Sequence, residues 1–378
     1  MISAGGGRRR SLSNVGGRAA RTGDPALSEA LAHCLEVDPE APLPFTHGFH
    51  PWPARMHPET ARRAIDSFPA TRVLDPFVGS GTTALEAVRA GRPFTGVDVS
   101  RVAIEVAWAR TRVLLPEACR AVEREAGRIA SQAAKFVHRE IQLPAWAERD
   151  RHWYPPHTLK EIVLLLDLIG ESRDPVLGRI LRAVLSSIVV KVSRQVSDSV
   201  PIADRDARVW KPGTAFRFFR ERGVELTGML LRLSSDLHKR KVAFVELELK
   251  LADARKVDLE GPFDLVLSSP PYPGVYDYAA HHRLRYPLFG EDGSFAVRHE
   301  IGARRDPAEY ANDLANSLRR IPLAPGARMI LLVGEGTIEG KRVRTDELLR
   351  GIPEFKVLAA ASQPRPGDRR ESLVLLSR

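Results

Sequence analysis

The pattern of apolar and polar positions separates the chain into strand-like and helix-like segments. Short apolar runs at 73–74 and 94–97 are typical of buried strands, and the segment 82–90 between them repeats apolar residues at helical spacing. Gly91 follows this helical segment, at the place where a glycine commonly ends a helix. Two strands joined by a helix form a βαβ unit, so this part of the chain predicts parallel strands and an α/β fold.

A second group of strand-like segments fills the C-terminal third of the chain, and helical patterns occupy the middle. The apolar runs that predict strands lie at 242–249, 263–267, 327–336, 355–362 and 371–377. From about 101 to 240 the apolar spacing is mostly helical, with proline-rich breaks. The pattern therefore predicts a doubly wound, Rossmann-like α/β sheet whose sequence is split by a helical insertion.

Four segments follow from this organisation. We predict a flexible basic tail at 1–25, the first half of an α/β domain at 26–115, a helical insertion at 116–240 and the second half of the domain at 241–378. Residues 1–22 hold five arginines and no acidic residue. Such a segment fits either a non-specific phosphate-binding arm or a solvated start of the chain.

Composition and charge narrow the class of protein. Hydrophobic residues make up 43% of the chain and charged residues 28%, as in soluble globular proteins. No apolar run approaches the roughly 20 residues that span a bilayer, and no signal peptide is visible. Cys34 and Cys119 have neither disulfide nor metal spacing, so we expect a cytoplasmic protein. A net charge of +10 favours a polyanionic partner such as nucleic acid.

The stretch "LDPFVGSGTT", residues 74–83, predicts a ligand-binding loop. Asp75 ends a strand, Gly79 and Gly81 allow a sharp turn, and threonines open the following helix. The loop lacks the lysine of a P-loop and departs from the GxGxxG dinucleotide pattern. Asp98 closes the next strand, where a carboxylate can accept hydrogen bonds from ribose hydroxyls.

A second stretch, "SSPPY" at 268–272, follows the predicted buried strand 263–267. Proline donates no ladder hydrogen bond, so the strand cannot continue through it. The chain therefore delivers a serine, two prolines and a tyrosine to the edge of the sheet at which ligands bind in α/β folds.

Together, these motifs resemble those of the S-adenosylmethionine-dependent DNA amino-methyltransferases of the N4-cytosine and N6-adenine type. "DPFVGSGTT…GVDVS" looks like the cofactor motif of the family, "SSPPY" looks like its catalytic (D/N/S)-P-P-(Y/F) motif, and "HPWPARMHP" at 50–58 resembles a third motif near the methionine part of the cofactor. The resemblance covers about 45–100 and 250–378 well and the middle weakly. It implies a Rossmann-like methyltransferase sheet with the helical insertion lying between the cofactor and catalytic motifs.

The resemblance also implies roles for individual residues. The S-adenosylmethionine site would be formed by His50, Pro51, Arg55, Asp75, Pro76, Phe77, Gly79, Ser80, Gly81, Thr82, Asp98 and Asp253. The catalytic residues would be Ser269, Pro270, Pro271 and Tyr272. The segment 26–115 would be the cofactor-binding half and 241–378 the catalytic half, with 116–240 as a possible target-recognition region.

The chemistry of amine methylation agrees with these roles. The lone pair of an exocyclic amine is conjugated into the base, so the site must favour a pyramidal, nucleophilic nitrogen. The Ser269 hydroxyl and the Pro270 carbonyl are acceptors for the amino hydrogens, and the fixed φ of proline holds that carbonyl rigid. Tyr272 offers a ring on which a base turned out of the duplex can stack.

Ser269 also bears on the target base. A serine at this position is typical of the cytosine-N4 enzymes of the resembled family, which makes cytosine N4 the first prediction and adenine N6 the alternative. An RNA amine methyltransferase and a catalytically silent nucleic-acid-binding protein are the further alternatives. Methylation at cytosine C5 needs a cysteine nucleophile, and Cys34 and Cys119 lie away from both motifs. The sequence leaves open whether a restriction enzyme accompanies the protein.

Double-stranded DNA with a flipped base is the expected partner, and the candidate contacts lie in two segments. The candidates for DNA binding are Ser193, Arg194, Tyr276, His281, Arg283 and Arg285. The alternative for 276–286 is a solvated helix face with tyrosines in the core. His47, His50 and His57 lie among prolines and a tryptophan, so we expect a loop packed over the cofactor and no metal site.

Overall fold

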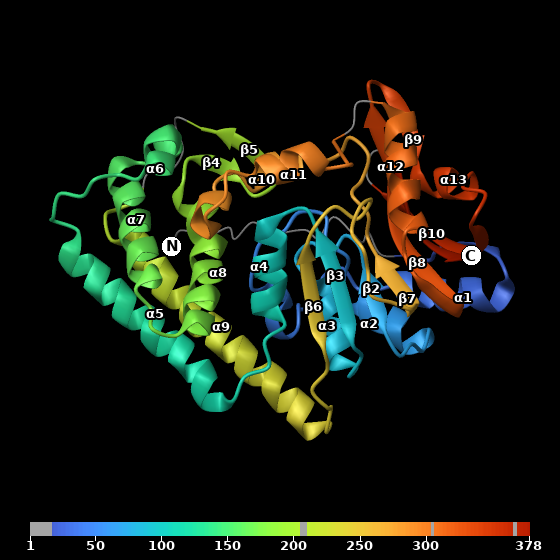
Figure 1. The fold of residues 1–378 in the computed structure, drawn as a ribbon, viewed down its shortest axis with the longest axis horizontal. Coiled ribbons are helices and arrows are strands. Elements are labelled where there is room, and N and C mark those ends of the chain that lie inside the picture. The colour runs from blue at the N-terminus through green and yellow to red at the C-terminus, as the bar shows by residue number, and fades with distance from the viewer. Residues whose placement is uncertain (1–16, 205–209, 304–305, 366–368) are drawn as a thin grey trace, which may run out of the picture.

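The computed structural model describes residues 17–204, 210–303, 306–365 and 369–378. Within them, nine strands form one mixed sheet (Figure 1). In spatial order the strands are β1 (Ala20–Gly23), β10 (Lys356–Arg365), β11 (Arg369–Ser377), β8 (Leu323–Ile338), β7 (Phe263–Ser268), β2 (Val73–Asp75), β3 (Phe94–Asp98) and β6 (Leu247–Leu251), with β9 (Lys341–Arg344) paired to β8.

The middle of this sheet is parallel and contains the point at which the strand order reverses. β6, β3, β2, β7 and β8 run parallel, whereas β11, β10 and β1 are antiparallel to their neighbours. From β2 the chain proceeds outward to β3 and β6, and from β7 it proceeds the other way to β8. The loops that leave β2 and β7 therefore diverge and open a crevice at the carboxyl ends of the strands.

Helices cover both faces of the sheet, which confirms the doubly wound α/β prediction. α1 (Pro25–Leu35), α2 (Pro58–Ser67), α3 (Thr82–Arg89) and α4 (Arg101–Arg110) pack against the face that presents Leu265 and Leu267. α12 (Pro307–Arg319) and α13 (Thr345–Arg350) pack against the opposite face, which presents Val266. The side chains of β7 thus alternate between two apolar layers, as the period of a strand requires.

The helices in the middle of the chain form a second hydrophobic core, which Phe49, Ala109, Leu284 and Leu288 from the flanking segments join. This middle segment comprises α5 (Pro116–Phe136), α6 (Ala145–Asp150), α7 (Pro156–Gly170), α8 (Pro175–Val192) and α9 (Thr214–Lys239), with a hairpin of β4 (Gln195–Ser197) and β5 (Val200–Ala203). Figure 1 shows these helices at one end of the sheet, with α10 (Tyr278–His281) and α11 (Ser294–His299) lying between β5 and the end of the sheet that carries β8 and β9.

Three helices begin with an Asp-Pro pair, which explains locally why they start where they do. In α1, α8 and α12 the aspartate accepts hydrogen bonds from backbone amides of the first turn, and proline follows it. Proline suits this position because its fixed φ is helical and its missing N–H would have no partner there.

Two sequence expectations need correction. Ala20–Gly23, placed in the flexible tail 1–25, form edge strand β1 against β10, while residues 1–16 lie outside the described residues. An edge strand needs only backbone pairing, so these exposed residues carry no apolar signal. The strand expected at 242–249 begins at Leu247 instead. Within the described residues, no helix combines the length and apolar character needed to span a membrane.

Gly81 lies where α3 and α4 pack most closely, and this contact generates a prediction. Its φ is +80°, and a Cβ there would lie 2.7 Å from the Cβ of Ala107. Gly81→Ala should therefore destabilise the protein by about 1–3 kcal/mol in urea unfolding. Gly127 in α5 has open space around it, and Gly127→Ala should instead stabilise by about 0.5–1 kcal/mol. Equal midpoints for the two variants would contradict this packing.

Candidate functional site

A cavity lies at the carboxyl ends of β2, β3, β6 and β7, and encloses about 970 Å³ of space not filled by protein atoms, part of it open to solvent. The loops after these strands form its floor, and the segments 52–56 and 278–301 form its walls. Of the residues predicted for the cofactor, those that line it are Arg55, Asp75, Pro76, Phe77, Gly79, Ser80, Thr82, Asp98 and Asp253. Ser269 and Pro271 of the catalytic motif line the same cavity.

Asp75 connects the two motifs. Its carboxylate accepts a hydrogen bond of 2.5 Å from the Ser268 hydroxyl and one of 3.0 Å from the Phe77 amide. The carboxylate is buried, and this burial raises the pKa of Asp75 to about 6. Because Ser268 precedes Ser269 directly, the bond fixes the catalytic motif beside the glycine loop.

Asp98 organises the other side of the loop. It accepts hydrogen bonds of 2.9 Å from the amides of Gly79 and Ser100, and burial raises its pKa to about 6. Gly79 also leaves room for Trp52, because a Cβ at Gly79 would lie 3.3 Å from the indole nitrogen. The loop after β2 is thus held between the end of β3 and an aromatic wall.

The cavity is acidic although the protein is basic. Asp75, Asp98 and Glu300 all line it, and burial raises the pKa of Glu300 to about 7. Among the described residues, the buried Thr82 hydroxyl, also at the cavity, has no hydrogen-bond partner. Buried carboxyls with raised pKa values favour a cationic ligand, which would lower their cost of ionisation. An unpaired buried hydroxyl is a further polar group that a ligand could satisfy.

Asp253 lines the cavity, but its carboxylate is already engaged. Arg255 donates to it at 2.7 Å, the His299 ring nitrogen Nδ1 lies 3.1 Å away, and Arg255 also bonds Asp313 at 2.6 Å. Asp253, predicted to be part of the cofactor site, therefore belongs to an ion-pair network that orders the loop after β6.

His50, Pro51 and Gly81 do not line the cavity, contrary to the expectation from the motif. The His50 ring is buried between the Pro51 carbonyl at 2.8 Å and the Ser186 hydroxyl of α8 at 3.0 Å. Gly81 is packed against Ala107. These residues position the walls of the cavity rather than forming them.

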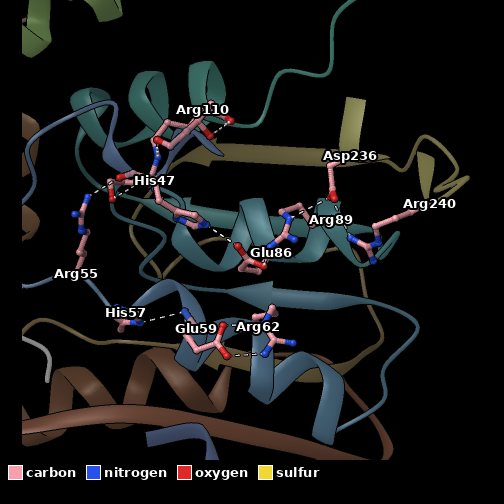
Figure 2. A network of polar contacts seen from close by, with 12 residues as sticks. His47, Arg55, His57, Glu59, Arg62, Glu86, Arg89, Arg110, Asp236 and Arg240 are labelled. Atoms are coloured by element: carbon pink, nitrogen blue, oxygen red, sulfur yellow. Dashed lines mark hydrogen bonds and ion pairs between the residues drawn. The ribbon is translucent and has the colours of Figure 1, made fainter. Parts of the chain in front are cut away.

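A buried polar network holds the segment that supplies Trp52 and Arg55 (Figure 2). Arg110 donates to Nδ1 of His47 at 2.8 Å, so the proton of the neutral ring is on Nε2, which donates to Glu86 at 2.6 Å. Arg55 in turn donates to the His47 carbonyl at 2.6 Å. Burial lowers the pKa of His47, which keeps the ring neutral. Two histidine nitrogens thus tie the segment to α3 and α4.

The catalytic motif contains two acceptors that are unpaired among the described residues. Within the described residues, the Ser269 hydroxyl and the Pro270 carbonyl make no hydrogen bond, whereas the Pro271 carbonyl accepts one of 3.1 Å from Tyr310. Pro270 and Tyr272 are not among the cavity-lining residues. Ser269 thus brings an unpaired acceptor to the cavity, whereas Pro270 does not line it.

Three of the predicted DNA contacts are structural. Arg285 is 1% exposed and donates to the carbonyls of Ser186 at 3.2 Å and His281 at 3.1 Å, besides pairing with Asp198. The buried His281 ring contacts the Ser199 carbonyl at 3.2 Å.

Ser193, the third of these residues, is also buried. Its hydroxyl donates to the Val190 carbonyl at 2.9 Å and accepts from the Gln195 amide at 3.0 Å, so it caps the end of α8. Of the other candidates, Arg283 is exposed, and Arg194 and Tyr276 are partly buried.

The structure adds residues that the sequence interpretation missed. They are Trp52, Ser100, Tyr278, His282, Tyr286 and Glu300, all lining the cavity. Trp52 and His282 stack with ring centroids 4.2 Å apart. Trp52 stood inside the quoted motif at 50–58 and could have been found there. Glu300 had no local signal, since its role depends on accepting hydrogen bonds from the amides of Tyr278 and Ala279.

Cysteine and metal chemistry have no support at this site. Cys34 and Cys119 are buried in α1 and α5. In the part of the chain that the structure describes, no group of three or more His, Cys, Asp or Glu side chains is arranged to hold a metal ion.

Comparison with known proteins supports the resemblance read from the motifs. Residues 39–108 match the N6_N4_Mtase family model, described as DNA methylase. The type II methyltransferase M.MvaI of Kocuria varians is 22% identical over 243 residues, which cover 60% of this chain and 53% of that protein. The chain thus spans about half the length of this curated relative. These matches confirm a relationship to the N6/N4 DNA methylases.

Two solved structures are also similar. TrmN from Thermus thermophilus has a TM-score of 0.32 at 14% identity, covering 85% of this chain and 49% of its own. The rRNA methyltransferase aviRa from Streptomyces viridochromogenes has a TM-score of 0.31 at 14% identity, covering 93% and 94%. The fold assignment itself rests on the strand order and on the helices on both faces.

The contrast between Arg285 and Arg283 can be tested directly. Arg285→Met leaves Asp198 and two buried carbonyls without their donor and should destabilise the protein by about 3 kcal/mol in urea unfolding. Arg283→Met, two residues away and exposed, should change stability by no more than about 0.5 kcal/mol. If Arg285→Met left the stability unchanged, Arg285 would again be a candidate for phosphate contact.

Proposed function

We propose that this protein is an S-adenosylmethionine-dependent DNA methyltransferase that transfers a methyl group to the exocyclic N4 amine of cytosine after the base is flipped out of the duplex. The observation that carries the proposal is the Ser268–Asp75 hydrogen bond, which joins the glycine loop of the cavity to the SPPY motif. The match of 39–108 to a DNA methylase family supports the substrate class. Methylation of adenine N6 is the alternative, since the family model includes both amines.

The cavity fits S-adenosylmethionine, whose sulfonium is the methyl donor. Asp98 lies at the end of the second strand of the βαβ unit, where its remaining lone pairs can accept ribose hydroxyls. Asp75 and Glu300 supply negative charge for the cationic groups of the cofactor, and the Arg55 guanidinium can face its carboxylate. The Thr82 hydroxyl, unpaired in the cavity, would gain a partner.

The acceptors at the catalytic motif suit an amine substrate. The Ser269 hydroxyl and Pro270 carbonyl would each accept an amino hydrogen and so draw the nitrogen lone pair out of conjugation. Rigid placement beside the methyl donor favours the in-line approach that the transfer requires. Neither the Ser269 hydroxyl nor the Pro270 carbonyl needs to ionise, so both would act through their placement relative to the amine.

The helical segment 116–240 is proposed as the part that holds DNA against the site. Its core also includes Phe49 and Ala109 of the half at 26–115 and Leu284 and Leu288 of the half at 241–378, so the segment packs against both halves. Arg194, Tyr276 and Arg283 remain the candidate contacts, because Ser193, His281 and Arg285 are buried.

Cofactor affinity should depend on pH. Asp75 and Asp98 have pKa values of about 6 and Glu300 of about 7, so acidification through this range removes negative charge from the cavity. Between pH 8 and pH 5.5 the affinity for S-adenosylmethionine in calorimetry should fall by about tenfold. The affinity for S-adenosylhomocysteine, which lacks the sulfonium charge, should fall less over the same pH range.

Protonation of these three carboxyls should not reduce the stability of the fold. Their pKa values are raised in the folded state, so their protonation on acidification favours the folded state, and reduced binding at pH 5.5 would report the cavity charge. An affinity for S-adenosylmethionine that is unchanged between the two pH values would contradict the electrostatic role of the three carboxyls.

The target is identified by labelling. The protein is incubated with unmethylated duplex DNA and tritiated cofactor, the DNA is digested to nucleosides, and label is expected in N4-methylcytidine. Label in N6-methyladenosine would establish the alternative, and label only with RNA would exclude DNA as the substrate.

Replacement of the Ser269 hydroxyl tests its role as an acceptor. Ser269→Ala should lower the rate of methyl transfer by about 10²-fold with unchanged cofactor affinity. A variant that transfers methyl at the rate of the parent protein would refute the role of the hydroxyl.

A further inference from the structure

The aromatic ring of the catalytic motif is held by residues far along the chain. Tyr272 lies across the strand pair β8–β11, in which Gly334 and Glu371 are directly opposite each other. A Cβ at Gly334 would lie 2.5–3.0 Å from three ring atoms of Tyr272, so the ring rests on the bare backbone of β8. The Tyr272 hydroxyl donates a hydrogen bond to the Glu371 carboxylate.

Two neighbouring glycines, Gly336 and Gly302, are in similarly close contact with Pro273 and Pro271. A Cβ at Gly336 would overlap the Pro273 carbonyl, and a Cβ at Gly302 would lie 2.8 Å from the Cβ of Pro271. Side chains at Gly334 and Gly336, both in β8, would lift Tyr272 and Pro273 off the strand. The alternation of Gly334, Glu335 and Gly336 therefore gives the motif a flat floor on one face of the strand.

Glu371 is an unusual anchor because its carboxylate is buried. The side chain is 2% exposed, burial raises its pKa, and Arg365 pairs with it on the adjacent strand β10. An acceptor at this depth is costly unless it is hydrogen-bonded, and the Tyr272 hydroxyl supplies such a bond. The contact with Gly334 and the hydrogen bond to Glu371 thus fix the plane of the ring.

We propose that Glu371 and Gly334 are positioning residues that fix the Tyr272 ring as the stacking surface for the flipped base. This inference rests on the proposed function. Glu371 acts through Tyr272: it sets the plane of the ring, and the ring sets the position of the base relative to Ser269 and the methyl donor. Loss of the anchor should lower the rate of methyl transfer without weakening cofactor binding.

The test compares four variants in single-turnover methyl transfer to duplex DNA. Tyr272→Phe and Glu371→Leu should each lower the rate about tenfold, with cofactor affinity within about twofold of the parent. The double variant should also lose about tenfold, because both changes remove the same hydrogen bond. Glu371→Gln retains an acceptor oxygen of the same reach and should recover most of the rate.

Glu335→Gln is the matched control. Glu335 is a second buried acid, adjacent to Gly334, but it pairs with Arg342 and not with Tyr272. Its replacement should leave the transfer rate within about threefold of the parent, whatever its effect on the unfolding midpoint. Losses in Tyr272→Phe and Glu371→Leu that multiply in the double variant, or a folded Glu371→Leu at the parent rate, would overturn the proposal.

A readout that does not require activity separates this inference from the proposed function. With 3-fluorotyrosine incorporated, the fluorine resonance of Tyr272, assigned by its absence in Tyr272→Phe, should shift in Glu371→Leu and stay in place in Glu335→Gln. If the parent transferred no methyl group, the proposed function would fail, and an unshifted resonance would overturn the positioning role separately.

Discussion

The buried hydrogen bond between Ser268 and Asp75 is the contact on which the site depends. It joins the ends of two neighbouring parallel strands whose residues are 193 positions apart in the chain. At this place the strand order reverses, so the following loops diverge and leave a crevice between them. Without a connection across the crevice, the glycine loop and the catalytic motif would be two independent loop ends. With it, their relative position is fixed by side chains that water does not reach.

Two other buried polar connections extend the same arrangement outward. His47 ties the segment before α2 to Glu86 and Arg110, and Arg285 ties the segment after the catalytic motif to α8 and the β4–β5 hairpin. Charged groups at such depth add little net stability, but leaving one unpaired is costly. These buried groups therefore make alternative placements of the loops energetically unfavourable, because such placements would leave a charge unpaired. The site is built from several separated segments, so a precise loop geometry requires that alternative placements be unfavourable.

The parts of the molecule that sequence analysis predicted are those with local causes. The strands around 73–97, the glycine loop and the SPPY turn follow from apolar runs, glycine and proline, which act on their own backbone. Arg285 shows the limit: an arginine after aromatic residues looks like a phosphate contact, and only the carbonyls of distant Ser186 and nearby His281 reveal that it is buried. Glu300 and Glu371 were invisible for the same reason, because their partners come from other segments.

The charge distribution separates two tasks that oppose each other electrostatically. A net charge of +10 favours a polyanionic partner, whereas the cavity concentrates buried carboxyls that suit a small cation. Fields from exposed charges decay within about 8 Å at physiological ionic strength, while groups in a buried cavity interact with little screening. An acidic cavity is therefore compatible with the proposed binding of DNA by the surface. The raised pKa values of Asp75, Asp98 and Glu300 reflect the free-energy cost of ionising carboxyls in a buried cavity. A bound cation would lower that cost.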